Sequence, residues 1–153
     1  MPGRLQQEIK QNRPFPDKEA EAFLNLQRTA DFLMQELTEA LKPACLSATQ
    51  YNILRILRGA EPEGLSCREI GERLITRDPD LTRLLDRMEE RGLVTRRRGE
   101  RDRRVVTVKI ASKGLDALES LDDPLQRLVK KQFRDFDEAR LDLLIGLLES
   151  LRD

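Results

Sequence analysis

Apolar residues recur at helical spacing near both ends of the chain. After Asp17, a candidate N-cap, steps of three and four residues connect the apolar positions of a long first helix that ends at Lys42-Pro43. Ser112 is expected to cap a second series, with a kink or a restart expected at Pro124, and a last helix follows Asp137. The last helix is apolar on two sides, and one subunit does not offer enough surface to cover it. These terminal segments therefore predict association with a second copy of the chain.

The middle of the chain contains shorter helical patterns. Ser47 caps one helix, and Ser66 with Glu69 forms a capping-box pattern that opens a second. Asp78-Pro79 starts a third helix, which stops at Gly92. Two short helices joined by a tight turn, the second with a polar face, predict a helix-turn-helix.

An alternating pattern follows the third helix. A strand begins at Leu93, and residues 106–110 alternate between apolar and polar side chains. The turn between these strands, at residues 99–102, has arginines on both sides. We interpret this hairpin as the wing of a winged helix-turn-helix.

Positive charge is concentrated in this hairpin. From Arg91 to Lys109 the sequence has eight basic and two acidic residues, a net charge of +6, whereas the whole chain has a net charge of zero. A neutral protein that gathers its positive charge on one element is expected to bind a polyanion there.

These elements predict a mainly α protein (α+β), a winged helix-turn-helix with a two-stranded β wing and a helical dimerisation region from both termini. Residues 1–16 contain three prolines and little periodicity, so an irregular N-terminal arm is expected there. Residues 17–46 and 112–153 are assigned to the dimerisation region, and residues 47–111 to the DNA-binding domain.

The composition excludes other classes of protein. Hydrophobic residues make up 39% and charged residues 37% of the chain, which is typical of a helix-rich protein with its own core. No apolar run reaches the ~18 residues of a membrane span. The N-terminus lacks the apolar core of a signal peptide, so a cytoplasmic protein is expected. Histidine and the common phosphate-binding and nucleophile motifs are absent, so we expect no enzyme, no metal site and no cofactor.

Three segments carry a resemblance to a known family. They are LSATQYNILRIL at 46–57, LTRLLDRMEERGLVTR at 81–96 and RDRRVVTVKIASKG at 101–114. In this order and spacing they resemble MarR-type transcriptional regulators, from about residue 17 to the end of the chain. The resemblance implies a homodimer on double-stranded DNA, with one winged helix on each half of a pseudo-palindromic operator. It also implies a repressor that is relieved by a small anionic or phenolic effector.

By this resemblance, the helix at 79–91 enters the major groove. Arg83 and Arg87 lie one turn apart on its exposed face, where arginine can bind guanine or phosphate through two hydrogen bonds. The alternative is intrahelical pairing, of Arg83 with Asp80 or Asp86 and of Arg87 with an adjacent glutamate.

The start of this helix departs from the family pattern. Asp78 has a structural role as the cap. Asp80 could accept a hydrogen bond from a cytosine amino group or hold Arg83 in position, and we prefer the second interpretation. Thr82 fits the family's Thr-Arg pair and could donate to a phosphate.

The wing is expected to reach the minor groove. By resemblance, Arg104 enters it and Asp102 pins the Arg104 guanidinium, while Arg101 and Arg103 contact phosphates. The alternative is an ion pair that braces the turn. Residues 96–98 are arginines that alternate in direction, so at most two of them face DNA. The full set of predicted DNA contacts is Arg77, Asp80, Thr82, Arg83, Arg87, Arg101, Asp102, Arg103 and Arg104.

Two further hypotheses remain open. Tyr51 and Arg55 could provide a hydroxyl and a cation for an effector, although core packing of Tyr51 and a solvated Arg55 are the simpler interpretation. Cys45 and Cys67 permit a thiol-based redox-sensing regulator. The simpler role of both cysteines is to fill space as small apolar side chains. The acidic start of the recognition helix and the neutral total charge also permit a winged helix that contacts proteins instead of DNA.

Overall fold

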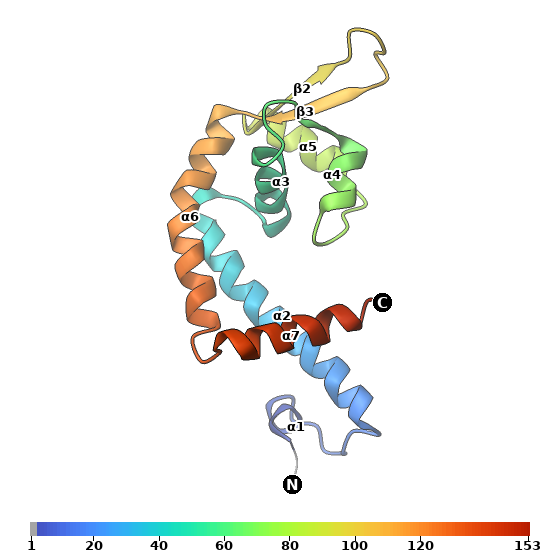
Figure 1. Ribbon diagram of the computed structural model, residues 1–153, viewed down its shortest axis with the longest axis vertical. Coiled ribbons are helices and arrows are strands. Elements are labelled where there is room, and N and C mark those ends of the chain that lie inside the picture. The colour runs from blue at the N-terminus through green and yellow to red at the C-terminus, as the bar shows by residue number, and fades with distance from the viewer. Residues whose placement is uncertain (1–2) are drawn as a thin grey trace.

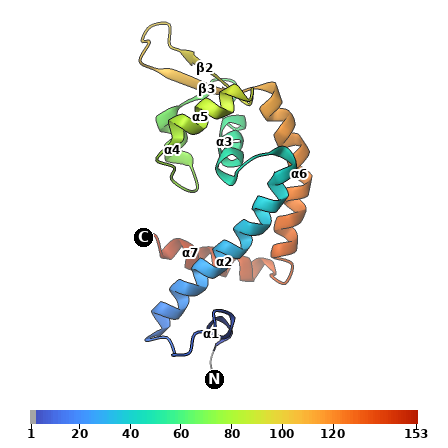
Figure 2. The ribbon, with the colours of Figure 1, turned by 180° about the vertical axis from the view of Figure 1, so that it is seen from behind.

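The computed structural model describes residues 3–153. In chain order its elements are α1 (Arg4–Glu8), α2 (Lys18–Leu41), the 3-10 helix η1 (Lys42–Ala44), α3 (Ala48–Arg58), β1 (Leu65–Ser66), α4 (Cys67–Arg73), α5 (Leu81–Glu90), β2 (Val94–Arg98), β3 (Val106–Ile110), α6 (Ser112–Gln132) and α7 (Glu138–Ser150). The helices α3, α4 and α5 gather at one end beside the wing, which projects outward (Figure 1). The long helices α2 and α6 lead away from this end towards α7 and α1 (Figure 2). The chain is thus mainly helical, as predicted.

The long helices begin and end close to the predicted residues. The Asp17 carboxylate accepts a hydrogen bond from the Ala20 amide at 2.7 Å, and Asp137 plays the same role for α7. At α6 the N-cap position is Ala111, so Ser112 is the first helical residue and not the cap. The helix also continues through Pro124 without a restart, because residues on both sides of the proline pack against the core.

The helices of the winged part begin at side-chain caps, with one exception. Ser47 forms a capping box at the start of α3, and Ser66 accepts a hydrogen bond at the start of α4. The exception is α5, which begins at Leu81, two residues later than predicted. The carboxylate of Asp78 accepts a hydrogen bond from the Asp80 amide at 2.8 Å, so Asp78 closes a local turn instead of capping the helix.

The sheet of the described residues has three antiparallel strands in the order β1-β3-β2. Val94 lies opposite Ile110, and Arg98 lies opposite Val106, which is the predicted wing hairpin. The two-residue strand β1 pairs with the other edge of β3. The sequence predicts only two strands, because two residues are too few to show an alternating pattern.

One apolar core joins the winged part to the ends of α2 and α6. Its fully buried side chains are Leu41, Ile53, Leu54, Leu57, Ile70, Leu85, Met88, Val94, Val108 and Leu118. This packing is continuous across residues 46–47 and 111–112, where the sequence analysis divides the chain. The winged part is therefore packed directly against the long helices.

Residues 3–16 contain a helical turn that the predicted irregular arm did not include. Positions 1–2 lie outside the described residues, but the short helix α1 forms at Arg4–Glu8 and buries Leu5. A single buried leucine among prolines gives no helical period, which is why the sequence pattern does not predict this turn.

The helices far from the wing expose apolar side chains. No residue of α7 is fully buried, and Leu143 and Leu147 are 63% and 58% exposed. Leu151, directly after the helix, is 67% exposed. On α2, Phe23 and Phe32 are similarly exposed. Within residues 3–153, no helix combines the length and the apolar character that crossing a membrane requires.

Candidate nucleic-acid interface

The recognition helix α5 buries one face and exposes the other. Leu85 and Met88 are almost completely buried in the core, so the rotation of the helix about its axis is fixed. Thr82, Arg83 and Arg87 lie on the exposed face, as the helical period predicts. The buried apolar side chains of α5 thus keep its polar face directed towards solvent.

The two arginines of this face are not engaged in ion pairs with other described residues. Asp80 stands at the N-cap position of α5 but makes no capping hydrogen bond, and it does not hold Arg83. Asp86, the other predicted partner of Arg83, pairs with Arg96. Arg83 and Arg87 therefore keep their hydrogen-bond donors available to a ligand outside the chain.

Arg96 joins the wing to the recognition helix. Its Nη2 lies 2.6 Å from an Asp86 carboxylate oxygen and 3.0 Å from one of Glu89, and the second Glu89 oxygen accepts the Arg96 amide at 3.1 Å. The hydrogen bond from Arg96 lowers the pKa of Glu89 below its ordinary value. Because Arg96 is occupied in this way, it orients β2 on α5 and is not available to DNA.

The tip of the wing is braced by main-chain contacts. The carboxylate of Asp102 accepts a hydrogen bond from the amide of Arg104 at 3.0 Å, and Arg98 donates to the carbonyl of Arg103 at 3.2 Å. The expected contact between Asp102 and the Arg104 guanidinium does not form among the described residues, because the short Asp side chain closes its own turn. The side chains of Arg101, Arg103 and Arg104 are exposed.

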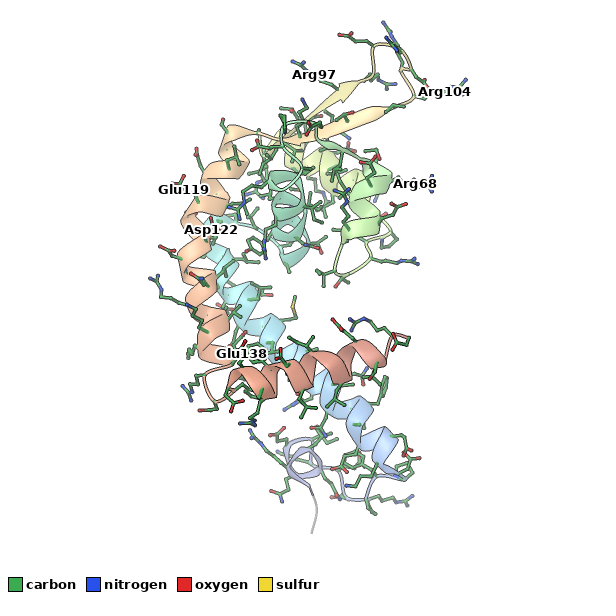
Figure 3. All side chains as sticks on the ribbon, in the orientation of Figure 1. Arg68, Arg97, Arg104, Glu119, Asp122 and Glu138 are labelled. Atoms are coloured by element: carbon green, nitrogen blue, oxygen red, sulfur yellow. The ribbon has the colours of Figure 1, made fainter. Side chains whose placement is uncertain are left out.

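A cleft between α4, α5 and the wing brings two predicted contact residues together. It has a volume of about 430 Å³, and both Thr82 and Arg104 line it. Arg68 of α4 lines the same cleft, and Figure 3 shows Arg68 and Arg104 projecting on the same side of the molecule. Arg68 is not among the DNA contacts predicted from the sequence. Its position at the start of α4 was the signal that could have identified it.

The other predicted residues lie in separate places. Arg77 is exposed in the turn before α5. Tyr51 packs against the core, and the exposed Arg55 lies over its ring at 5.9 Å from the centroid. Cys45 is exposed, whereas the half-buried Cys67 has its sulfur 3.9 Å from the Thr82 hydroxyl oxygen.

The fold and this interface define a winged helix-turn-helix DNA-binding protein. Residues 46–106 match the MarR family. The chain is 32% identical, over 121 residues, to the HTH-type transcriptional regulator SarZ of Staphylococcus saprophyticus, which covers 79% of this chain and 78% of that relative. The chain belongs to the MarR family of transcriptional regulators, which confirms the family and the fold class expected from the sequence.

Solved structures show the same fold. A MarR transcription factor from Planctomyces limnophilus is 40% identical with a TM-score of 0.69, and the match covers 88% of this chain and 98% of that one. A cysteine-to-serine variant of Escherichia coli MarR, complexed with operator DNA, is 26% identical with a TM-score of 0.71. That match covers 85% of this chain and 95% of the other.

Proposed function

We propose that this MarR-family regulator acts as a homodimer that binds a pseudo-palindromic operator, with α5 in the major groove and the wing in the adjacent minor groove. The observation that carries the proposal is the interface itself. Arg83 and Arg87, which have no ion-pair partner in residues 3–153, lie on the exposed face of α5. Thr82 of the same helix and the exposed Arg104 of the wing tip line one cleft. The relative from Escherichia coli was crystallised with operator DNA, which supports the same use of this surface.

The proposed contacts fall into two groups. Thr82, Arg83 and Arg87 of α5 contact base edges and phosphates, and Arg104 occupies the minor groove. The second group consists of Arg77, Arg101 and Arg103, which contact phosphates, and Asp102, which holds the turn that carries Arg104. The first group specifies the sequence, and the second contributes mainly to affinity.

The proposed dimer interface is formed by the helices far from the wing. No residue of α7 is buried in the single chain, and the exposed leucines of α7 and phenylalanines of α2 form an apolar surface that water disfavours. A second subunit that interlocks its own terminal helices with these removes that surface from water. Two winged parts are then held at a fixed separation.

Regulation is the finer part of the proposal. The regulator represses its genes, and a small anionic or phenolic effector relieves repression. The exposed Arg55 provides a cation for such a molecule, and the Tyr51 ring beside it provides an aromatic surface. Both residues lie on α3, which packs against α6 and the end of α2 through the common core, so a ligand there would contact the elements that join the winged part to the dimer.

Selection of bound duplexes from a random pool tests the proposal. We expect an inverted repeat whose half-sites are centred roughly 34 Å apart, one helical turn. Titration of that duplex against salt should give a slope of about −0.9 in log K per phosphate contact. No enrichment, even at low salt, would contradict the proposal and would favour a winged helix that contacts proteins.

A further inference from the structure

Arg91, the residue directly after α5, turns away from the candidate interface. It occupies the C-cap of the helix, and Gly92, with φ of +73°, then redirects the chain. The Arg91 guanidinium donates from Nη1 to the carbonyl oxygen of Cys45 at 2.8 Å and from Nη2 to that of Ala44 at 3.3 Å. Arg91 is one of the eight basic residues of the segment 91–109, but its donors are occupied within the protein.

The two carbonyls that Arg91 contacts belong to the end of the helical segment that continues α2. Ala44 is the last residue of η1, and Cys45 follows it in a left-handed conformation with φ of +53°. Carbonyl groups at a helical C-terminus lack partners within the helix and carry partial negative charge, so they attract a guanidinium. Arg91, at the end of α5, therefore supplies hydrogen-bond donors to the carbonyl groups at the end of η1.

This contact lies between α2, which belongs to the proposed dimer interface, and the recognition helix α5. Leu41, at the end of α2, is completely buried in the core, so α2 is firmly attached to the winged part. The opposite end of α2 exposes Phe23, which the proposed function assigns to the partner subunit. Arg91 and η1 therefore form a direct connection between the end of α2 and the end of α5.

We propose that Arg91 is a positioning residue that couples the recognition helix to the dimer helix α2, and so fixes the separation of the two recognition helices without itself contacting DNA. The inference rests on the proposed function. Arginine suits this role because its planar fork offers two donors to two carbonyls, whereas lysine offers a single ammonium group.

The test compares Arg91→Gln and Arg91→Lys with the unchanged protein on the selected operator. Arg91→Gln should weaken binding about tenfold, since two charge-assisted hydrogen bonds are lost, and Arg91→Lys should fall between it and the unchanged protein. The salt slope should stay unchanged in both variants. The comparison variant is Arg101→Ala, which should reduce the slope by about one phosphate contact.

Operators with altered spacing give a readout that a loss of folding would not produce. Adding one base pair between the half-sites rotates them by roughly 34° and should weaken binding by the unchanged protein strongly. Arg91→Gln should discriminate less between the original and the lengthened operator, because its recognition helices are held less firmly. Melting temperatures measured on the same samples identify the range in which every variant is folded.

Three results would overturn the inference. A reduced salt slope for Arg91→Gln would make Arg91 a phosphate contact. Unchanged affinity with unchanged spacing discrimination would remove its positioning role. Weaker binding that disappears once the variant is fully folded would reduce Arg91 to a stabilising residue. Failure of the unchanged protein to bind any duplex would instead contradict the proposed function.

Discussion

Asp102 binds the main chain of Arg104 and leaves its guanidinium unconstrained by that carboxylate. An arginine whose backbone is fixed but whose side chain is exposed can extend into a groove without first breaking an ion pair. The conformation of the turn and the reach of the side chain are therefore supplied by different groups of the wing. This separation allows the two roles to be tested independently.

Replacing Arg104 by Ala is expected to weaken operator binding by about 1–3 kcal/mol, because the proposed minor-groove contact is lost. The melting temperature and the dimer should not change, since the side chain is exposed. Fluorescence anisotropy on the selected duplex, with calorimetry on the free protein, measures both. The matched change Asp102→Asn keeps an oxygen that can accept from the Arg104 amide, so it should bind within about threefold of the unchanged protein.

If Arg104→Ala binds its operator like the unchanged protein, the wing does not contact DNA through this residue. A large loss in Asp102→Asn would instead indicate that the negative charge of Asp102 acts on the guanidinium in the complex.

Among the elements, helix ends that depend on neighbouring residues were predicted well from the sequence. Asp17, Ser47 and Asp137 each cap a helix through an amide within three residues, so the signal is contained in a short segment. The period of α5 predicted its buried and exposed faces for the same reason. The recognition helix and the wing could thus be located from local patterns alone.

Features that depend on distant contacts could not be predicted. Arg91 and Arg96 look like the other arginines of the hairpin in the sequence, but their partners lie at the end of η1 and on α5. Asp78 had two possible partners, a helix end or its own turn, and only the structure distinguishes them. Composition therefore overstated the positive charge that is available to DNA.

The helices α3 and α6 are joined by an ion pair with two hydrogen bonds. Arg58 donates from Nη1 and Nη2 to the two carboxylate oxygens of Asp122, at 2.8 and 3.1 Å, and Figure 3 labels Asp122 on α6. The hydrogen bond from Arg58 lowers the pKa of Asp122 below its ordinary value of 3.8. Both side chains are partly exposed, so the pair is expected to stabilise the fold only modestly.

Asp122→Asn should lower the free energy of unfolding at pH 7 by about 0.5 kcal/mol, within the range of exposed ion pairs. Because the pKa of Asp122 is lowered in the folded state, this contribution is present above pH 3.8 and is lost as the pH falls through the lowered value. Denaturant unfolding of the unchanged protein and of Asp122→Asn, at pH 7 and again below pH 3.8, measures the difference in the free energy of unfolding. Asp123→Asn, the neighbouring exposed carboxylate, is the control and should show no such pH-dependent loss.

Equal effects of the Asp122 and Asp123 substitutions would show that general charge, and not the pair with Arg58, determines the result.

At the scale of the whole molecule, the apolar side chains of α7 are poorly buried. It contributes no buried residue to the single chain, and Leu143, Ile145 and Leu147 are each more than half exposed. A 13-residue helix without tertiary packing is marginal in water. Folding of this end of the chain is therefore expected to depend on association.

Leu147→Glu should raise the dimer dissociation constant at least about tenfold, because it places a charge in the proposed apolar interface. Sedimentation or light scattering over a dilution series measures it. The control is Ile75→Glu, because Ile75 is 89% exposed in the turn between α4 and α5, outside the helices assigned to the interface. An unchanged dimer in Leu147→Glu, or equal dissociation in both variants, would contradict the interface.

The basic wing of a chain with no net charge also gives each subunit an electric dipole, since the compensating acidic excess lies in the rest of the chain. Near the negatively charged duplex, such a dipole is oriented with the wing towards the DNA. This orientation acts within the Debye length of ~10 Å, beyond which salt screens the field. For the proposed operator complex, this charge distribution would favour encounters that begin with the wing towards the duplex, and so would shorten the search as well as hold the final complex.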